Sequence, residues 1–128
     1  MPLTLEDRLE ITELVARYNQ AIDTRDGAGY AETFTDGGVF QIAGQQEVRG
    51  RERLMRMIER LDPPNSRHWV NNMVIDGDGD TATMTCYLAV LRDLRITNMG
   101  FYVNALKKVE GAWKFVRRDY TPDPRTVE

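Results

Sequence analysis

The sequence predicts an α+β protein, a cone-shaped open barrel of curved antiparallel sheet with three N-terminal helices covering a pocket. Near the N-terminus, apolar residues recur at three- and four-residue spacing, which is typical of an amphipathic helix. The second half instead holds long segments rich in Thr, Val, Tyr and Leu, separated by turn signals. Helices that are segregated from antiparallel strands along the chain indicate the α+β class, and the first helix is the element expected to cover the apolar sheet face.

The elements are expected in the following order. A first helix of about 20 residues begins after Thr4, which with Asp7 resembles a capping box, and ends near Gly27. Its apolar positions are Leu5, Leu9, Leu14, Val15, Tyr18 and Ile22. In the rest of the first half, the sequence predicts a short helix at 29–34, a turn at 36–38, a strand at 39–43 and a helix at 51–61. The second half reads as strands at 67–75, 81–92, 100–109 and 112–120, with a loop at 93–98.

Composition narrows the class of protein. A chain of 128 residues is expected to form one domain over residues 1–128. A net charge of −3 argues against a nucleic-acid-binding protein, which needs a basic face. We expect a cytoplasmic protein, because the sequence has a single cysteine and no apolar leader. We expect no membrane partner, because no run of 18 apolar residues occurs. With one histidine and one cysteine the sequence offers no zinc-binding constellation, and we expect no metal.

Three residues could handle protons in a single pocket: Tyr18, Asp23 and His68. His68 is the only histidine, and its side chain is the one that titrates near neutral pH without perturbation. If an aspartate accepts a hydrogen bond from one ring nitrogen, the other nitrogen becomes a competent base. Each residue also has an ordinary structural interpretation. Asp23 could be a solvated helix-end residue, Tyr18 a core residue, and His68 structural or exposed.

Two-residue alternation places His68 on one face of its strand, together with Val70, Asn72 and Val74. A face with His and Asn near one end and Val beyond them suits a cavity that is polar in one part and apolar in another. The sequence therefore adds Asn72 to the candidate binding residues.

Several motifs occur in a diagnostic order along the chain. They are Tyr18-x-x-x-x-Asp23, Arg67-His68-x-x-x-Asn72, the run Asp76 to Ala82, Gly100-Phe101-Tyr102 and the run Gly111 to Phe115. In this order and spacing, over roughly residues 5 to 120, the sequence resembles the SnoaL-like branch of the nuclear-transport-factor-2-like superfamily. The resemblance implies the same cone-shaped fold, and a homodimer that forms through the outer face of the sheet.

The resemblance also implies a chemistry. Scytalone dehydratase and bile acid dehydratase are similar in having a tyrosine and an aspartate on the first helix and a histidine on the strand after the third. By this likeness Asp23 and His68 form a dyad, His68 removes a proton next to a carbonyl, and Tyr18 donates a hydrogen bond, with no metal or organic cofactor. The lindane dehydrochlorinase shares the Asp and His, so the leaving group stays open. The expected small hydrophobic substrate, steroid- or polyketide-like, would lie among Val39, Phe40, Met55, Leu88, Val90 and Tyr102.

The chain also departs from these enzymes. Arg92 stands where scytalone dehydratase has a second histidine, and Gly100 and Tyr102 replace its Ser and Asn. Arg92 could hold a carboxylate or enolate oxygen, or could lie in solvent at a strand end. The base of ketosteroid isomerase would fall at Ile42, which argues against that mechanism.

Three interpretations of the function remain on sequence grounds. The first is a cofactor-independent lyase, a dehydratase or a related isomerase. The alternative is a non-catalytic binding module whose cavity carries a small hydrophobic ligand, because a fold does not by itself imply a function. A third reading, an accessory subunit with a filled cavity, predicts no hollow between the helices and the sheet.

Overall fold

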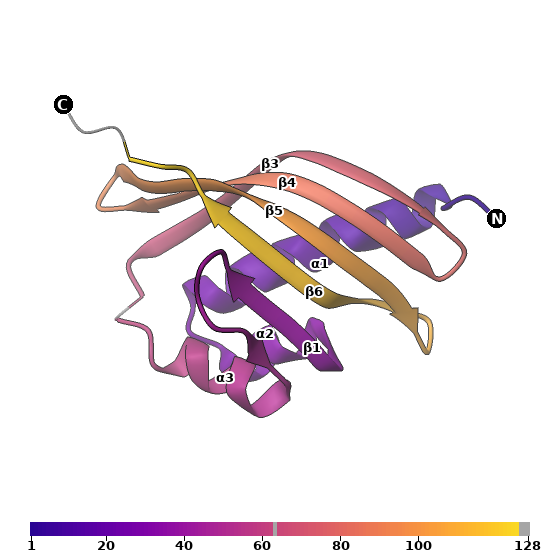
Figure 1. The fold of residues 1–128 in the computed structure, drawn as a ribbon, viewed down its shortest axis with the longest axis horizontal. Helices are drawn as coiled ribbons and strands as arrows, with labels where there is room; N and C mark the ends of the chain where they lie inside the picture. Colours follow the sequence, from indigo (N-terminus) through magenta and orange to yellow (C-terminus); the bar gives the residue numbers. More distant parts are fainter. Residues whose placement is uncertain (63, 126–128) are drawn as a thin grey trace.

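The computed structural model describes residues 1–62 and 64–125 and contains three helices and one six-stranded sheet (Figure 1). The helices are α1 (Leu5–Asp23), α2 (Gly27–Glu32) and α3 (Arg51–Glu59). The strands are β1 (Phe34–Ile42), β2 (Val48–Arg49), β3 (Ser66–Asp78), β4 (Thr81–Arg92), β5 (Arg95–Val109) and β6 (Ala112–Pro122). Within this described part, no helix is both long enough and apolar enough to cross a membrane.

The sheet has the order β2-β1-β6-β5-β4-β3, and every neighbouring pair is antiparallel except β1 and β6, which are parallel. Its long strands curve over α1, while α2 and α3 lie beside β1 at one end (Figure 1). The sheet does not close, since β2 and β3 remain its two edges. The predicted α+β class and the open, curved barrel are therefore confirmed.

The N-terminus of α1 has the predicted capping box. The Thr4 hydroxyl accepts from the Asp7 backbone N–H at 3.0 Å, and the Asp7 carboxylate accepts from the Thr4 N–H at 3.0 Å. Asp7 is also held by the Trp113 indole N–H at 3.0 Å and by the Lys108 ammonium at 3.2 Å. These bonds tie the first turn of α1 to the hairpin of β5 and β6.

The buried face of α1 differs from the prediction at its start. Ile11, Tyr18 and Ile22 are buried, whereas the side chains of Leu5 and Leu9 are 74% and 61% exposed. A helix turns by about 100° per residue, which places Leu5 and Leu9 on the side opposite to Ile11 and Tyr18.

Several boundaries also differ from the prediction, and the differences are clearest at α2, β1 and β5. The short helix lies at Gly27–Glu32 because the Asp26 carboxylate accepts from the Gly29 N–H at 2.9 Å and caps it. The residues 36–38, expected as a turn, belong to β1, whose register against β6 shifts between Phe34 and Val39. The loop expected at 93–98 is a tight turn at Asp93 and Leu94, with φ of 50° and 63°, so that β5 begins at Arg95. Asp-Leu carries none of the glycine that usually marks such a hairpin turn.

A bulge in β3 overturns the predicted alternation along that strand. The pairing of β3 with β4 shifts register between Asn71 and Val74, and Asn72 has a φ of 51°. One extra residue reverses which side chains face inward beyond it. Asn72 and Val74 are therefore exposed, and Met73 lies partly buried against the core in their place.

Candidate active site

A cavity of about 210 Å³ lies between the helices and the concave face of the sheet. Its wall is mainly apolar, with an imidazole, an amide and four phenols as the polar groups. The lining residues are Tyr18, Ile22, Tyr30, Phe40, Ile42, Met57, Ile58, Leu61, His68, Leu88, Val90, Asn98, Tyr102 and Tyr120. An apolar hollow with a few convergent polar groups is the usual form of a small-molecule site.

The structure brings Asp23 and His68 together at the wall of this cavity. Asp23 is the last residue of α1, and His68 lies near the start of β3, where the strand passes that helix end. The Asp23 Oδ1 lies 2.6 Å from His68 Nδ1, and its Oδ2 accepts the His68 backbone N–H at 3.1 Å. The side chains of His68 and Asp23 are only 13% and 11% exposed. One carboxylate thus fixes both the ring and the backbone of the histidine.

The hydrogen bond to Asp23 determines the tautomer of His68. An ionised carboxylate only accepts hydrogen bonds, so the short contact places the proton on Nδ1. Burial lowers the pKa of His68 below its ordinary value of 6.5, and this outweighs the opposing effect of Asp23; the charges of Arg25 and Arg92 lower it further. His68 is therefore neutral at pH 7. Its Nε2 has no hydrogen-bond partner in the part of the chain that the structure describes, and it keeps a free lone pair.

Tyr18, in the second half of α1, lines the cavity, whereas Asp23 does not line it and instead contacts His68, which does. The Tyr18 hydroxyl lies 3.0 Å from that of Tyr30, and both phenols are buried. Burial raises the pKa of each phenol well above its ordinary value of 10.0. Both are therefore protonated hydrogen-bond donors. Because one hydroxyl donates to the other, the pair keeps one O–H for a ligand.

The remaining predicted binding residues divide into two groups. Phe40, Leu88, Val90 and Tyr102 line the cavity, as expected for inward positions of the sheet. Val39, Met55, Asn72 and Arg92 do not line it.

A local cause accounts for three of these four positions. The bulge in β3 turns Asn72 outward. On α3, Met57 and Ile58 face the cavity, while Met55 packs where α3 crosses Gly27. The Arg92 guanidinium donates to the Asn65 amide oxygen at 2.7 Å, at the end of β4.

Three of the phenol and amide groups that line the cavity, those of Tyr30, Asn98 and Tyr120, were not predicted as site residues from the sequence. Tyr30 belongs to the short second helix, for which no site residue was predicted, and Asn98 was expected in a loop rather than in β5. Alternation along the last strand could have placed Tyr120 on the inner face together with Arg118, which is fully buried. No sequence signal marks the Tyr18–Tyr30 pair, since it joins two different helices.

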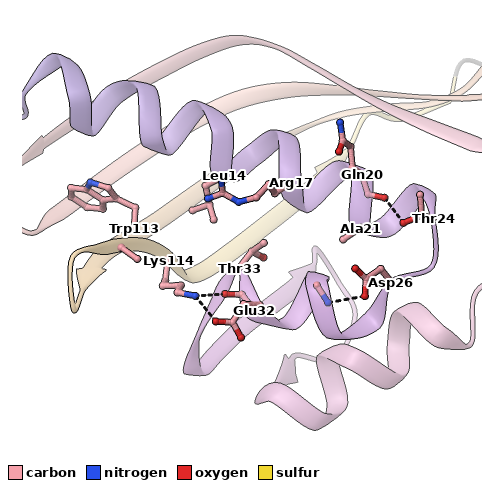
Figure 2. A pocket seen from close by; sticks show the side chains of 12 residues that line it. Leu14, Arg17, Gln20, Ala21, Thr24, Asp26, Glu32, Thr33, Trp113 and Lys114 are labelled. Atoms are coloured by element: carbon pink, nitrogen blue, oxygen red, sulfur yellow. Dashed lines mark hydrogen bonds and ion pairs between the residues drawn. The ribbon is translucent and has the colours of Figure 1, made fainter.

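Within the described ranges 1–62 and 64–125, no three His, Cys, Asp or Glu side chains come together as a metal site. A second hollow of about 430 Å³ lies between α1, α2 and the start of β6 (Figure 2). Its charged groups already have protein partners: the Lys114 ammonium lies 2.9 Å from the Glu32 carboxylate, Asp26 caps α2, and Arg17 forms an ion pair with Glu13 outside the hollow. It contains no imidazole or thiol, so the cavity at His68 is the stronger candidate.

Comparison with known proteins decides the family. A family model described as the SnoaL-like domain matches residues 3–119. The chain belongs to the SnoaL-like family. No curated protein matches it. This family lies within the nuclear-transport-factor-2-like superfamily. Membership supports a role in binding or converting a small molecule.

Solved structures agree with this SnoaL-like fold. A protein of unknown function with a cystatin-like fold from Nostoc punctiforme is 32% identical, with a TM-score of 0.90, and the match covers 97% of this chain and 96% of that one. A protein of unknown function from Mycobacterium tuberculosis is 31% identical, with a TM-score of 0.87 over 94% and 73% of the two chains. A putative scytalone dehydratase from Novosphingobium aromaticivorans shares the fold at 20% identity, with a TM-score of 0.82 over 97% and 91%.

Proposed function

We propose that this SnoaL-like protein is a cofactor-independent lyase of the hydro-lyase type, or a related isomerase, acting on a small, largely apolar cyclic carbonyl compound. The observation that carries the proposal is the His68 imidazole in the cavity wall, whose Nδ1 lies 2.6 Å from the Asp23 carboxylate. A neutral imidazole with its second nitrogen free is a general base suited to neutral pH. The apolar lining matches a ring-bearing substrate, whether a steroid or a polyketide.

In the proposed reaction, His68 Nε2 takes the proton from the carbon next to the carbonyl. The imidazolium that forms is stabilised by the Asp23 carboxylate, and the electron pair of the broken C–H bond moves onto the carbonyl oxygen. That oxygen accepts the free O–H of the Tyr18–Tyr30 pair. In a dehydration, the enolate then expels hydroxide from the neighbouring carbon, and His68 returns its proton to form water. In an isomerisation, the proton returns to a different carbon.

His68→Gln tests this proposal. We expect the variant to fold and to keep binding a product-like ligand, but to lose turnover of cyclic β-hydroxyketones by roughly 10²–10⁴-fold. Asp36→Asn, at an exposed position of β1, is the control and is expected to retain full turnover. A His68→Gln protein with wild-type turnover would overturn the mechanism. If wild-type protein binds such compounds and converts none of them, the cavity serves as a binding module, the alternative that its apolar wall also supports.

We further propose that the protein is a homodimer through the outer face of its sheet. Apolar side chains gather there on three adjacent strands: Trp69 on β3, Tyr87 on β4, and Met99, Phe101 and Val103 on β5. Tyr87 pairs directly with Phe101 across the strands. Trp69 and Tyr87 are 62% and 55% exposed in the single chain. A contiguous exposed apolar patch on a sheet face is typical of a protein interface.

The oligomeric state can be measured by light scattering coupled to size exclusion. We expect a dimer for the wild type and a monomer for Tyr87→Glu, because the substitution places a charge in the middle of the patch. Thr12→Glu, on the exposed face of α1, is the control and is expected to remain dimeric. A monomeric wild type would contradict this part of the proposal.

A further inference from the structure

Arg118 is a cation buried in the core beside the cavity. Its side chain is fully inaccessible, on β6, and Nε donates to the Asn104 Oδ1 at 2.7 Å. Asn104 is itself held by a hydrogen bond to the Met84 carbonyl at 2.9 Å. Nη2 lies 3.9 Å from the Cys86 sulfur, and Nη1 has no hydrogen-bond partner among the described residues. The guanidinium is thus held in position but is not fully satisfied.

No carboxylate compensates this charge within the described residues. The adjacent Arg117 shows the contrast, because it forms ion pairs with Glu47 and with Asp119 on the more exposed side of β6. An unpaired buried cation costs free energy that an apolar side chain of the same size would not cost. Its position therefore calls for a role beyond filling space.

Aromatic rings surround the guanidinium and separate it from the cavity. Its central carbon lies 4.3 Å from the centroid of the Tyr18 ring, 3.8 Å from that of Tyr102 and 4.5 Å from that of Phe115. Such contacts offset part of the cost of burial. Tyr18 and Tyr102 also line the cavity, so the positive charge lies about one ring away from a bound ligand.

The phenols of the cavity offer more O–H donors than the protein itself uses. The Tyr18–Tyr30 pair keeps one free O–H, and the buried Tyr120 hydroxyl, also in the lining, has no partner among the described residues. Burial raises the pKa values of Tyr18, Tyr30 and Tyr102, and the charge of Arg118 acts against that rise without cancelling it. These groups therefore stay protonated, close to a positive charge.

We infer that Arg118 is a positioning residue that makes the phenol-lined part of the cavity prefer an anionic oxygen over a neutral one. The preferred ligands are then enolisable cyclic ketones, whose oxygen becomes negative during the reaction, and phenolates that resemble the enolate. The reaction part of this inference rests on the proposed function. The preference for an anion does not, because it follows from a charge and from donors that are present without turnover.

A series of nitrophenols of graded acidity tests the inference, since their absorbance reports which form is bound. We expect the wild type to bind the phenolate at least about tenfold more tightly than the neutral phenol. This magnitude follows because the charge of Arg118 acts on the phenolate oxygen across one aromatic ring, in a medium of intermediate dielectric constant. Arg118→Met should lose this preference and Arg118→Lys should retain most of it. Arg117→Met, the control at the neighbouring position, should leave it unchanged. His68→Gln should also retain it, which separates the effect from that of the imidazole.

Several results would overturn the inference: a wild type that binds the neutral phenol as tightly as the phenolate, a wild type that binds neither form, or an Arg118→Met variant that keeps the preference. If Arg118→Met fails to fold, as circular dichroism would show, the inference is still tested by the affinities of the wild type and of Arg118→Lys for the phenolate and the neutral phenol. Failure of the proposed function looks different. A protein that prefers phenolates but converts no hydroxyketone rejects the lyase and leaves the inference standing, whereas turnover without that preference rejects only the inference.

Discussion

Asp23→Asn should transfer the ring proton of His68 from one nitrogen to the other. In the wild type, the two oxygens of Asp23 accept two hydrogen bonds from His68, at 2.6 Å from the ring and 3.1 Å from the backbone. An asparagine has one acceptor oxygen and one donor group in the same positions. If its oxygen keeps the backbone N–H, its NH₂ faces Nδ1, which must then accept. The proton moves to Nε2, and the base is blocked.

The magnitude follows from the bonds that are exchanged. A hydrogen bond to a charged acceptor contributes about 1.5–3 kcal/mol, so we expect Asp23→Asn to lower the free energy of unfolding by about 2 kcal/mol. If the proposed reaction is correct, blocking the base should lower turnover by roughly 10²–10⁴-fold. The pKa of His68 should fall further below its ordinary value, because the variant removes the partner that raises it.

The chain has a single histidine, which makes the measurement unambiguous. Long-range ¹H–¹⁵N correlation spectra report which ring nitrogen carries the proton, without any substrate. We expect the Nδ1–H tautomer for the wild type at neutral pH and the Nε2–H tautomer for Asp23→Asn. Asp26→Asn, at the cap of α2, is the control that should keep the wild-type tautomer. A wild-type His68 with its proton on Nε2, or one charged at pH 7, would refute the reasoning.

Three further predictions concern stability. Thr4→Ala removes the hydroxyl that caps α1 at the Asp7 N–H and should cost about 1 kcal/mol in urea unfolding, while an unchanged midpoint would count against the cap. Gly100→Ala places a Cβ against the Thr121 carbonyl and the Tyr120 ring, so we expect the free energy of unfolding to fall by about 1–3 kcal/mol, measured by thermal unfolding. A variant as stable as the wild type would show that β6 can shift to make room for the Cβ. Burial holds the pKa of His68 below 6.5, so the unfolded chain takes up a proton first on acidification. The free energy of unfolding should therefore fall as the pH drops below 6.5, and less so in His68→Gln; parallel pH profiles for the two proteins would contradict this.

The local pattern of the sequence predicts the elements that depend on neighbouring residues. The capping box of Thr4 and Asp7 and the full extent of β4 are as expected, because capping bonds and two-residue alternation act within a few residues. The predicted family is also confirmed, since motif order along the chain survives where single residues differ. Even here, Asp93 and Leu94 adopt a hairpin turn that their residue types do not signal.

Other features exist only because distant segments meet. The bulge that turns Asn72 outward depends on the pairing of β3 with β4, so the alternation of β3 by itself predicts the wrong face. The spacing of Tyr18 and Asp23 along α1 left open whether both line one pocket, and only the packed chain shows that Asp23 lies outside the lining and contacts His68 instead.

By itself, the sequence determined the α+β class, the order of the main helices and strands, the family and the residue types available for acid–base chemistry, since all of these follow from periodicity, capping and motif order. The tertiary structure decided which groups share the cavity, that burial lowers the pKa of His68, and that Arg118 is buried beside the phenols with no carboxylate partner among the described residues. The reason is physical: burial and hydrogen-bond geometry depend on contacts between residues as far apart as Asp23 and His68, or Tyr18 and Arg118, and local patterns do not encode such contacts.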